Sequence, residues 1–207
     1  MSSHTIAAVM GWLAAAVGVA SVIPQFRRAR SIGVDGVSLA TWSLFAMLGC
    51  FWIAYGTVVH SIQLILLSSI LLPLQLTIIH RLSPSFHVAV VVRATGYFVL
   101  CCVVPTLIWG WSGGVYGAGV AMTATRLPQL IELVRSREVS GVSAATWYIF
   151  SLCSALWIGY WSYTMAWAPL FANMAAGVTS LAIAVLATYR HVGQRRRRAG
   201  VVVLVAN

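Results

Sequence analysis

Apolar residues run through this 207-residue chain in long blocks, separated by short polar connections. Each block is long enough to cross a bilayer core of about 30 Å at 1.5 Å of rise per residue. The pattern therefore predicts seven membrane-spanning helices. Their expected ranges are roughly 5–25, 38–58, 61–80, 88–108, 113–133, 143–164 and 168–189. Polarity does not alternate within the blocks, which argues against the strands of a membrane barrel.

Composition agrees with a membrane protein. The chain is 60% hydrophobic and 8% charged, with a mean hydropathy of +0.91. Soluble domains carry about 25% charged residues. A secretory signal has positive charge before its apolar stretch, whereas residues 1–10 have none and arginines follow the first block. We expect that block to be a retained helix.

Two stretches of twenty residues spell nearly the same sequence. Residues 36–55 and 141–160 are identical at ten of twenty paired positions, including Gly-Val-Ser at the start of each. A Pro-Gln pair precedes each copy, at 24–25 and at 128–129. The constant offset indicates a duplicated unit. In an apolar chain, such a duplication is typical of transporters built from two pseudo-symmetric halves.

The repeat predicts an organisation along the chain. Residues 1–86 form a first triple-helix unit, 87–111 a linker helix, 112–190 a second triple-helix unit and 191–207 a basic cytosolic tail. Three spans are an odd number, so the unpaired fourth helix is needed to give both units the same orientation. We therefore expect an all-α membrane protein, with seven helices in a 3-1-3 arrangement of two parallel triple-helix-bundle repeats.

The charge distribution predicts the orientation. The net charge is +10 and all thirteen basic residues are arginines. With seven spans, every arginine falls on one side of the membrane or at helix ends facing it. The positive-inside rule then places the N-terminus outside and the C-terminus in the cytosol of a plasma-membrane protein. Four consecutive arginines at 195–198 are expected to contact anionic lipid, and a nucleic-acid partner is not expected.

Residues for catalysis are missing. The chain has three acidic residues, Asp35, Glu132 and Glu138, and none lies mid-membrane. No cluster of histidine, cysteine and acidic residues has the spacing of a metal or catalytic site. We therefore expect no enzyme activity, no metal and no cofactor.

Two deep tryptophans are the first candidate binding residues. Trp52 and Trp157 occupy matched positions, each followed three residues on by a tyrosine, Tyr55 or Tyr160. A flat apolar ring at this depth can stack on a sugar or a similar ligand. Helix packing is the competing interpretation. For Trp42, Trp147 and Trp161, which lie near helix ends, helix packing plus an interfacial tryptophan belt explains the pattern.

Polar residues on the third helix of each unit complete the predicted pocket. Asn173 follows Trp157 by sixteen residues, and the same offset in the first half gives Ser68 and then Ser69. An amide inside a membrane helix needs a partner, so it faces either a watery cavity or another helix. Both interpretations of Asn173 stay open.

The Pro-Gln pairs are candidate hinges or gates, and Tyr55 and Tyr160 belong to the same set of candidate gate residues. Pro24 and Pro128 each remove a backbone hydrogen bond, which lets a helix bend or end there. Gln25 and Gln129, at matched places, can satisfy the freed carbonyls or gate a pore. Nearby, Arg126 stands where the first copy has Val22. We expect Arg126 to extend its charge to the cytosolic interface, with a pair to Glu132 as the alternative.

These motifs resemble the PQ-loop superfamily, and within it the SWEET and SemiSWEET (MtN3/saliva) sugar carriers. The resemblance rests on the Pro-Gln pairs, the basic connections leading to Gly-Val-Ser, and Trp-x-x-Tyr at 52–55 and 157–160. It implies a substrate site formed by Trp52, Trp157 and Asn173, with Ser68 or Ser69 replacing the first-half asparagine. The second copy departs from the family's Trp-x-x-Tyr-Gly because Trp161 replaces the glycine.

The expected function is a facilitative carrier of a small neutral polar solute, most simply a sugar, that works by alternating access. The absence of a buried carboxylate favours uniport over proton coupling. An amino-acid carrier, with Arg126 receiving the substrate carboxylate, is one alternative. A receptor or scaffold with the same fold is another. A homo-oligomer is compatible with all three.

Overall fold

A computed structural model describes residues 3–60, 62–82, 87–163, 165 and 167–205. All regular secondary structure in these ranges is helical, which confirms the all-α prediction. Residues 61, 86 and 164, where expected elements begin or end, lie outside the described residues. Residues 206–207 of the expected tail also lie outside them.

The first three helices pack in the order first, third, second. They are α1 (Ser3–Ser31), α2 (Leu39–Val58) and α3 (Ile62–Arg81). α3 contacts both α1 and α2. α1 stays helical through Pro24, so this proline does not end the helix. Ser38 caps the start of α2, where its hydroxyl accepts a hydrogen bond from the Thr41 N–H at 3.3 Å.

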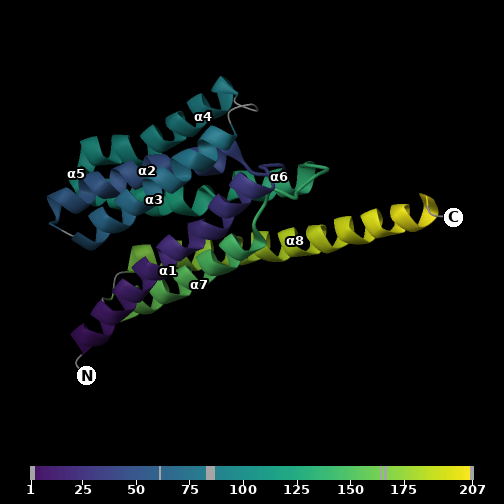
Figure 1. Cartoon of the computed structure of the whole chain (residues 1–207). Coiled ribbons are helices and arrows are strands. Elements are labelled where there is room, and N and C mark those ends of the chain that lie inside the picture. The colour runs from purple at the N-terminus through teal and green to yellow at the C-terminus, as the bar shows by residue number, and fades with distance from the viewer. Residues whose placement is uncertain (1–2, 61, 83–86, 164, 166, 206–207) are drawn as a thin grey trace.

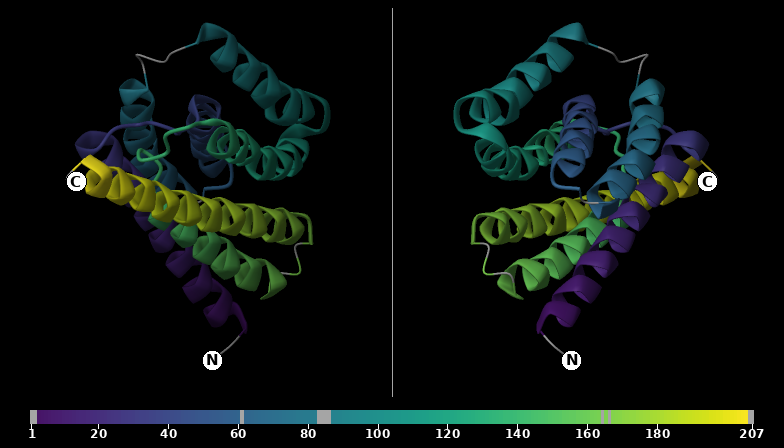
Figure 2. Two further views of the ribbon diagram at one scale, coloured as in Figure 1. Left: turned by 90° about the vertical axis from the view of Figure 1, so that its right-hand side faces the viewer. Right: turned by 90° about the vertical axis from the view of Figure 1, so that its left-hand side faces the viewer.

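The next part of the chain forms a helical hairpin. It comprises α4 (Val88–Phe98), a π-helical segment η2 (Val99–Val103) and α5 (Val104–Ala124). Gly110 has φ 67° and ψ −165°, which reverses the chain inside α5. Only glycine adopts this conformation without strain. The limb after Gly110 packs back against η2, and the reversal is visible as the teal turn in Figure 2.

Glycines let the two limbs of this hairpin approach closely. A Cβ atom on Gly117 would lie 1.5 Å from the Cys101 carbonyl oxygen, and one on Gly113 would lie 2.5 Å from that of Pro105. Small residues spaced four apart are the usual means by which membrane helices bring their backbones together. The hairpin therefore depends on glycine at both positions.

The last three helices repeat the packing order of the first three. They are α6 (Leu127–Arg135), which continues the path of α5 after a short break, α7 (Ala144–Tyr163) and α8 (Trp167–Val205). α8 contacts α5, α6 and α7, as α3 contacts α1 and α2. α8 stays helical through residue 190, where the sequence analysis placed the start of a tail, and its C-terminal part projects beyond the other helices (Figure 1).

Five helical segments are long and apolar enough to cross a membrane. They are Ala8–Ser31, Leu39–Val58, Leu64–Arg81, Val88–Arg135 and Leu170–Arg196. Several such helices indicate an integral membrane protein. The fourth segment covers two expected spans, 88–108 and 113–133, and α7 is a 20-residue helix outside the five. The seven-span 3-1-3 arrangement stays a prediction.

The largest hydrophobic core lies where the two halves meet. We call residues 1–86 the first half and 112–190 the second half. The core includes Val22 and Trp42 of the first half together with Leu133, Trp147 and Ile183 of the second, each at most 1% exposed. The belt interpretation is therefore wrong for Trp42 and Trp147, because both side chains are buried in protein.

Candidate functional site: the interface between the two repeats

The two glutamines of the Pro-Gln pairs hold the opposite half by its backbone. Gln25 Nε2 donates to the Gly141 carbonyl at 2.9 Å, and Gln25 Oε1 accepts from the Ser143 N–H at 2.7 Å. Gln129 makes the matching pair of bonds in the other direction. Its Nε2 donates to the Gly36 carbonyl at 2.7 Å, and its Oε1 accepts from the Ser38 N–H at 2.8 Å.

We call these four bonds, with Gln25, Gln129 and the two Gly-x-Ser segments at 36–38 and 141–143, the glutamine clasp. Both glutamine side chains are 1% exposed. Buried amides that satisfy both their donor and their acceptor fix a single geometry, because an unmade bond at such depth costs free energy. The sequence analysis predicted a role for these amides, but not that each would bind the opposite repeat.

The loops that carry Gly-Val-Ser also contact each other directly. The Gly141 N–H donates to the Asp35 carbonyl at 3.1 Å, and Arg28 Nε donates to the Ser140 carbonyl at 2.5 Å. A Cβ on Gly141 would lie 2.3 Å from the Asp35 nitrogen. Gly36 has φ +76°, a conformation that favours glycine. The two glycines thus permit the close approach on which the clasp depends.

The helix is continuous at Pro24 but interrupted before Pro128, although the hydroxyl three residues before each proline makes the same kind of hydrogen bond. The Ser21 hydroxyl donates to the Gly18 carbonyl at 2.6 Å, and Thr125, at the matched position, donates to the Met122 carbonyl at 2.7 Å. α1 nevertheless continues past Pro24, whereas the chain leaves the helix at residues 125–126 and α6 starts just before Pro128.

Arg126 is buried, which contradicts the expectation that its charge reaches the interface. The residue is 3% exposed, its Nε donates to Ser180 Oγ at 2.7 Å, and its Nη1 donates to the Met122 carbonyl. The guanidinium carbon lies 5.8 Å from the ring centres of both Phe45 and Phe150. The alternative pair with Glu132 is also wrong, since that carboxylate accepts from the Ser136 hydroxyl instead.

The rings around Arg126 come from matched positions of the two repeats. Phe45 and Phe150 lie 5.5 Å apart between ring centres, and each also contacts the tryptophan three residues before it in its own helix. We call Arg126, Phe45, Phe150 and Ser180 the arginine site. The prediction missed it because its members come from three helices and from the break between α5 and α6. The signal present in the sequence was a single arginine opposite a valine in the repeat alignment.

Gln75 is a second buried amide that the sequence analysis did not select. It is 5% exposed, and its Oε1 has no hydrogen-bond partner within the part of the chain that the structure describes. This oxygen would lie 3.5 Å from a Cβ on Gly49. Gly49 lies on α2 between Phe45 and Trp52, on the face that carries both rings. An acceptor without a donor therefore lies between the arginine site and the first predicted binding tryptophan.

The predicted binding tryptophans each belong to a local ring cluster. Trp52 is half-buried against Tyr55, with ring centres 6.0 Å apart, and Trp157 is half-buried against Tyr160 at 5.4 Å. Among the ring contacts of the described residues, none joins Trp52 to Trp157. Tyr55 also contacts Trp111 of α5, which the sequence analysis placed at the end of the linker helix, at 5.9 Å.

The Tyr160 ring lies close to α1 of the first half. A Cβ on Gly11 of α1 would lie 3.3 Å from the Tyr160 ring. Tyr160 therefore joins the two halves, and Tyr55 joins the first half to α5, both at a distance from the clasp. Their role as gates stays a prediction.

The polar residues predicted on the third helices differ in burial. Ser68 is 6% exposed, Ser69 is exposed and Asn173 is half-buried. Asn173 follows Ala172, whose carbonyl accepts the Thr123 hydroxyl of α5 at 3.3 Å. Ser68 is therefore the better first-half counterpart of Asn173, and the binding role of both stays a prediction.

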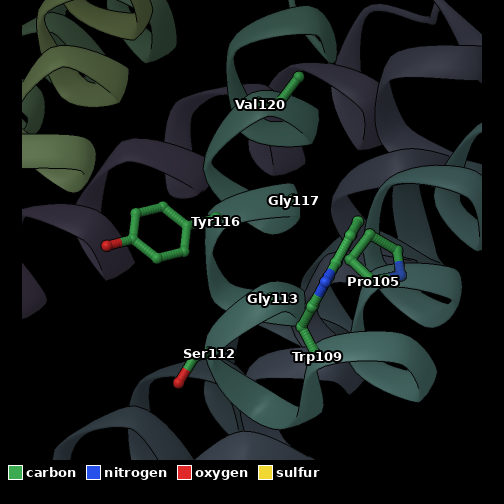
Figure 3. Close-up of a pocket in the computed structure, with 7 residues that line it drawn as sticks. All are labelled: Pro105, Trp109, Ser112, Gly113, Tyr116, Gly117 and Val120. Carbon is green, nitrogen blue, oxygen red and sulfur yellow. The ribbon is translucent and has the colours of Figure 1, made fainter.

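A separate groove lies on α5, away from these residues. It has a volume of about 420 Å³ and is lined between Pro105 and Val120, with Trp109 and Tyr116 as its rings (Figure 3). Trp109 is 68% exposed and Tyr116 63% exposed. The groove holds none of the predicted site residues. Its mostly apolar lining suits a lipid chain better than a polar solute.

Two residues of α8, Arg190 and His191, form hydrogen bonds to the loop between α6 and α7 and to the end of α6. Arg190 Nη1 donates to the Leu133 carbonyl at 2.6 Å and its Nη2 to the Ser136 carbonyl at 2.5 Å. A cation at these carbonyls also complements the dipole at the end of α6. His191 Nε2 contacts the Val139 carbonyl at 2.9 Å. α8 thus supports the loop that presents Gly141 and Ser143 to Gln25.

Comparison with known proteins adds no identification. A scan against protein-family models, a search of curated proteins and a search of solved structures each found no match to this chain.

Proposed function

We propose that this protein is a membrane carrier for a small polar solute, most simply a neutral sugar, and that it works by alternating access. The observation that carries the proposal is the glutamine clasp. Two copies of one sequence unit bind each other reciprocally at one end, through buried bonds that a rocking motion of the halves can break and remake as a set.

The proposed arrangement has seven spans in the 3-1-3 plan. The reversal at Gly110 supports counting the segment 88–135 as two membrane spans. The common packing order of the helices supports two equivalent triple-helix units. The first turn of α1 and the last turn of α8 lie at opposite ends of the molecule, as an odd number of spans requires (Figure 1). The clasp and the arginines then face the cytosol of a plasma-membrane protein, with the N-terminus outside.

The solute is proposed to bind between the halves, away from the clasp. Trp52 and Trp157 supply apolar rings, and Ser68, Asn173 and the Gln75 Oε1, which has no partner among the described residues, supply hydrogen bonds. The clasp closes the cytosolic end while the solute enters from outside, and Tyr55 and Tyr160 close the outer end when the clasp opens.

Counterflow in proteoliposomes tests this proposal. Labelled glucose is expected to exchange through the wild-type protein and to slow at least tenfold in Trp52→Ala and in Trp157→Ala. Trp109→Ala is the matched control, because this tryptophan lies on the exposed groove of α5. Equal flux in all three variants would contradict the proposed site.

The same assay separates the alternatives. Exchange of amino acids but not of sugars would favour the amino-acid carrier, for which the burial of Arg126 is the supporting observation. Ligand binding without flux would favour a receptor or scaffold. Accumulation above the external concentration, driven by a pH gradient, would contradict uniport.

A further inference from the structure

Arg126 combines two properties that call for an explanation. Its guanidinium is buried, and its described contacts are a hydroxyl, a carbonyl and two phenyl rings, with no carboxylate among them. Burying a charge is costly even when aromatic faces and hydrogen bonds compensate for part of the loss of water. A charged group at membrane depth is a functional candidate for that reason.

The fold itself does not need a cation at this place. Val22 occupies the matched position in the first half and is fully buried in the main core. Gln75 occupies the position that matches Ser180. In the part of the chain that the structure describes, its Oε1 has no donor, whereas Ser180 accepts from Arg126. The matched position is therefore buried in both repeats, by a valine in the first and by a charged arginine in the second.

The arginine site spans the boundary between the halves. Phe45 belongs to the first half and Phe150 to the second, and Gln129 of the clasp follows Arg126 by three residues, about one turn of helix. In the proposed rocking motion, separation of the halves at the clasp would move Phe45 away from Phe150, and the guanidinium would lose one of its two ring contacts. It then faces whatever passes between the halves.

None of the described contacts of Arg126 is with one of the chain's three acidic residues. Glu132 accepts from Ser136, and Glu138 accepts from the Val139 and Ser140 N–H groups of its own loop. Asp35 is exposed on the opposite loop. The boundary between the halves therefore carries the buried positive charge of Arg126, and charges interact more strongly in such a poorly hydrated place than in water.

We infer that Arg126 is the specificity-determining residue for solute charge. It excludes cationic solutes at the clasp end, admits neutral ones and binds the carboxylate of acidic ones as they pass. The inference rests on the proposed transport function. It assigns the buried arginine of the interface to selection, while the tryptophans bind the body of the solute.

The test uses three sugars of one shape and different charge. Glucose, glucuronate and glucosamine are compared in proteoliposomes, in a buffer acidic enough to keep the amine protonated. Wild-type flux of glucosamine is expected to be about tenfold or more below that of glucose, because like charges repel at this distance. In Arg126→Gln and in Arg126→Val, which copies the first half, the difference is expected to fall to about twofold.

Two further variants control this experiment. Arg126→Lys keeps the charge and is expected to keep the ranking. Arg93→Gln removes an exposed arginine whose Nε donates to the Ala89 carbonyl of its own helix. This variant is also expected to keep the ranking of the three sugars. An unchanged ranking in Arg126→Gln and Arg126→Val would overturn the inference while leaving the carrier proposal standing.

A binding measurement keeps the inference testable if no sugar is carried. Glucuronate is expected to raise the Tm of the detergent-purified wild type more than glucose does, and to lose this advantage in Arg126→Val. If glucuronate protects both proteins equally, or neither, the inference is overturned independently of the flux data.

Discussion

The two Pro-Gln regions share one motif and differ in backbone. Around Pro24 the helix is continuous and the residue two positions earlier is a buried valine. Around Pro128 the helix breaks and the equivalent residue is a buried arginine. The glutamines that follow nevertheless make the same pair of bonds to the other half. The clasp therefore depends on the glutamine and its Gly-x-Ser partner, and not on a particular bend of the proline helix.

The strongest test of this equivalence removes both glutamines. Gln25→Ala with Gln129→Ala leaves two buried N–H groups and two buried carbonyls without partners. We expect the free energy of unfolding to fall by about 2–6 kcal/mol, with each single variant contributing a similar share. Titration with denaturing detergent measures this change.

Gln75→Leu is the matched control for that experiment. It removes a buried glutamine of the first half whose Oε1 makes no bond within the described residues, so its cost is expected to be smaller. A large effect of one glutamine and none of the other would contradict the equivalence of the halves.

The next prediction concerns the loop contact. Gly141→Ala places a Cβ against the backbone nitrogen of Asp35. A backbone atom cannot move aside as the end of a flexible side chain can. We expect a loss of about 1–3 kcal/mol in stability. Gly193→Ala on α8 has nothing within 4 Å of the new Cβ and is expected to be neutral or slightly stabilising in the same unfolding assay.

A smaller effect is expected from the loop support that α8 provides. Arg190→Ala removes the donors to the Leu133 and Ser136 carbonyls, for a loss of about 1–2 kcal/mol. Hydrogen exchange in the segment 133–143 is expected to speed up, with that in 32–38 affected less. Arg196→Ala, exposed on the same helix, serves as the control. Equal acceleration in both variants would show that α8 acts on the loop through charge alone.

The smallest predicted effect compares the matched hydroxyls. Ser21→Ala and Thr125→Val each remove one bond to a carbonyl three residues back, at a cost of about 0.5–1 kcal/mol. The two thermal shifts are expected to agree in size. A much larger loss for Thr125→Val would mean that the broken helix depends on its hydroxyl while the continuous one does not.

The sequence predicted those features that repeat along the chain. The duplication, the helical class and the importance of both glutamines follow from local patterns. The partners of the glutamines do not, because residues 25 and 141 meet only when the two copies face each other. The expectation that Arg126 extends its charge to the cytosolic membrane surface was wrong for the same reason. Its surroundings are formed by residues 45, 150 and 180, which no spacing rule connects.

The most direct test of the account links the two loops across the clasp. In a variant without native cysteines, Asp35→Cys and Ser140→Cys are joined by a short, reducible bifunctional thiol reagent, and glucose counterflow is measured before and after reduction. The account predicts that flux stops when the loops are joined and returns when the link is reduced. Full flux through the linked protein would contradict it, because the halves would then carry solute without parting at the clasp.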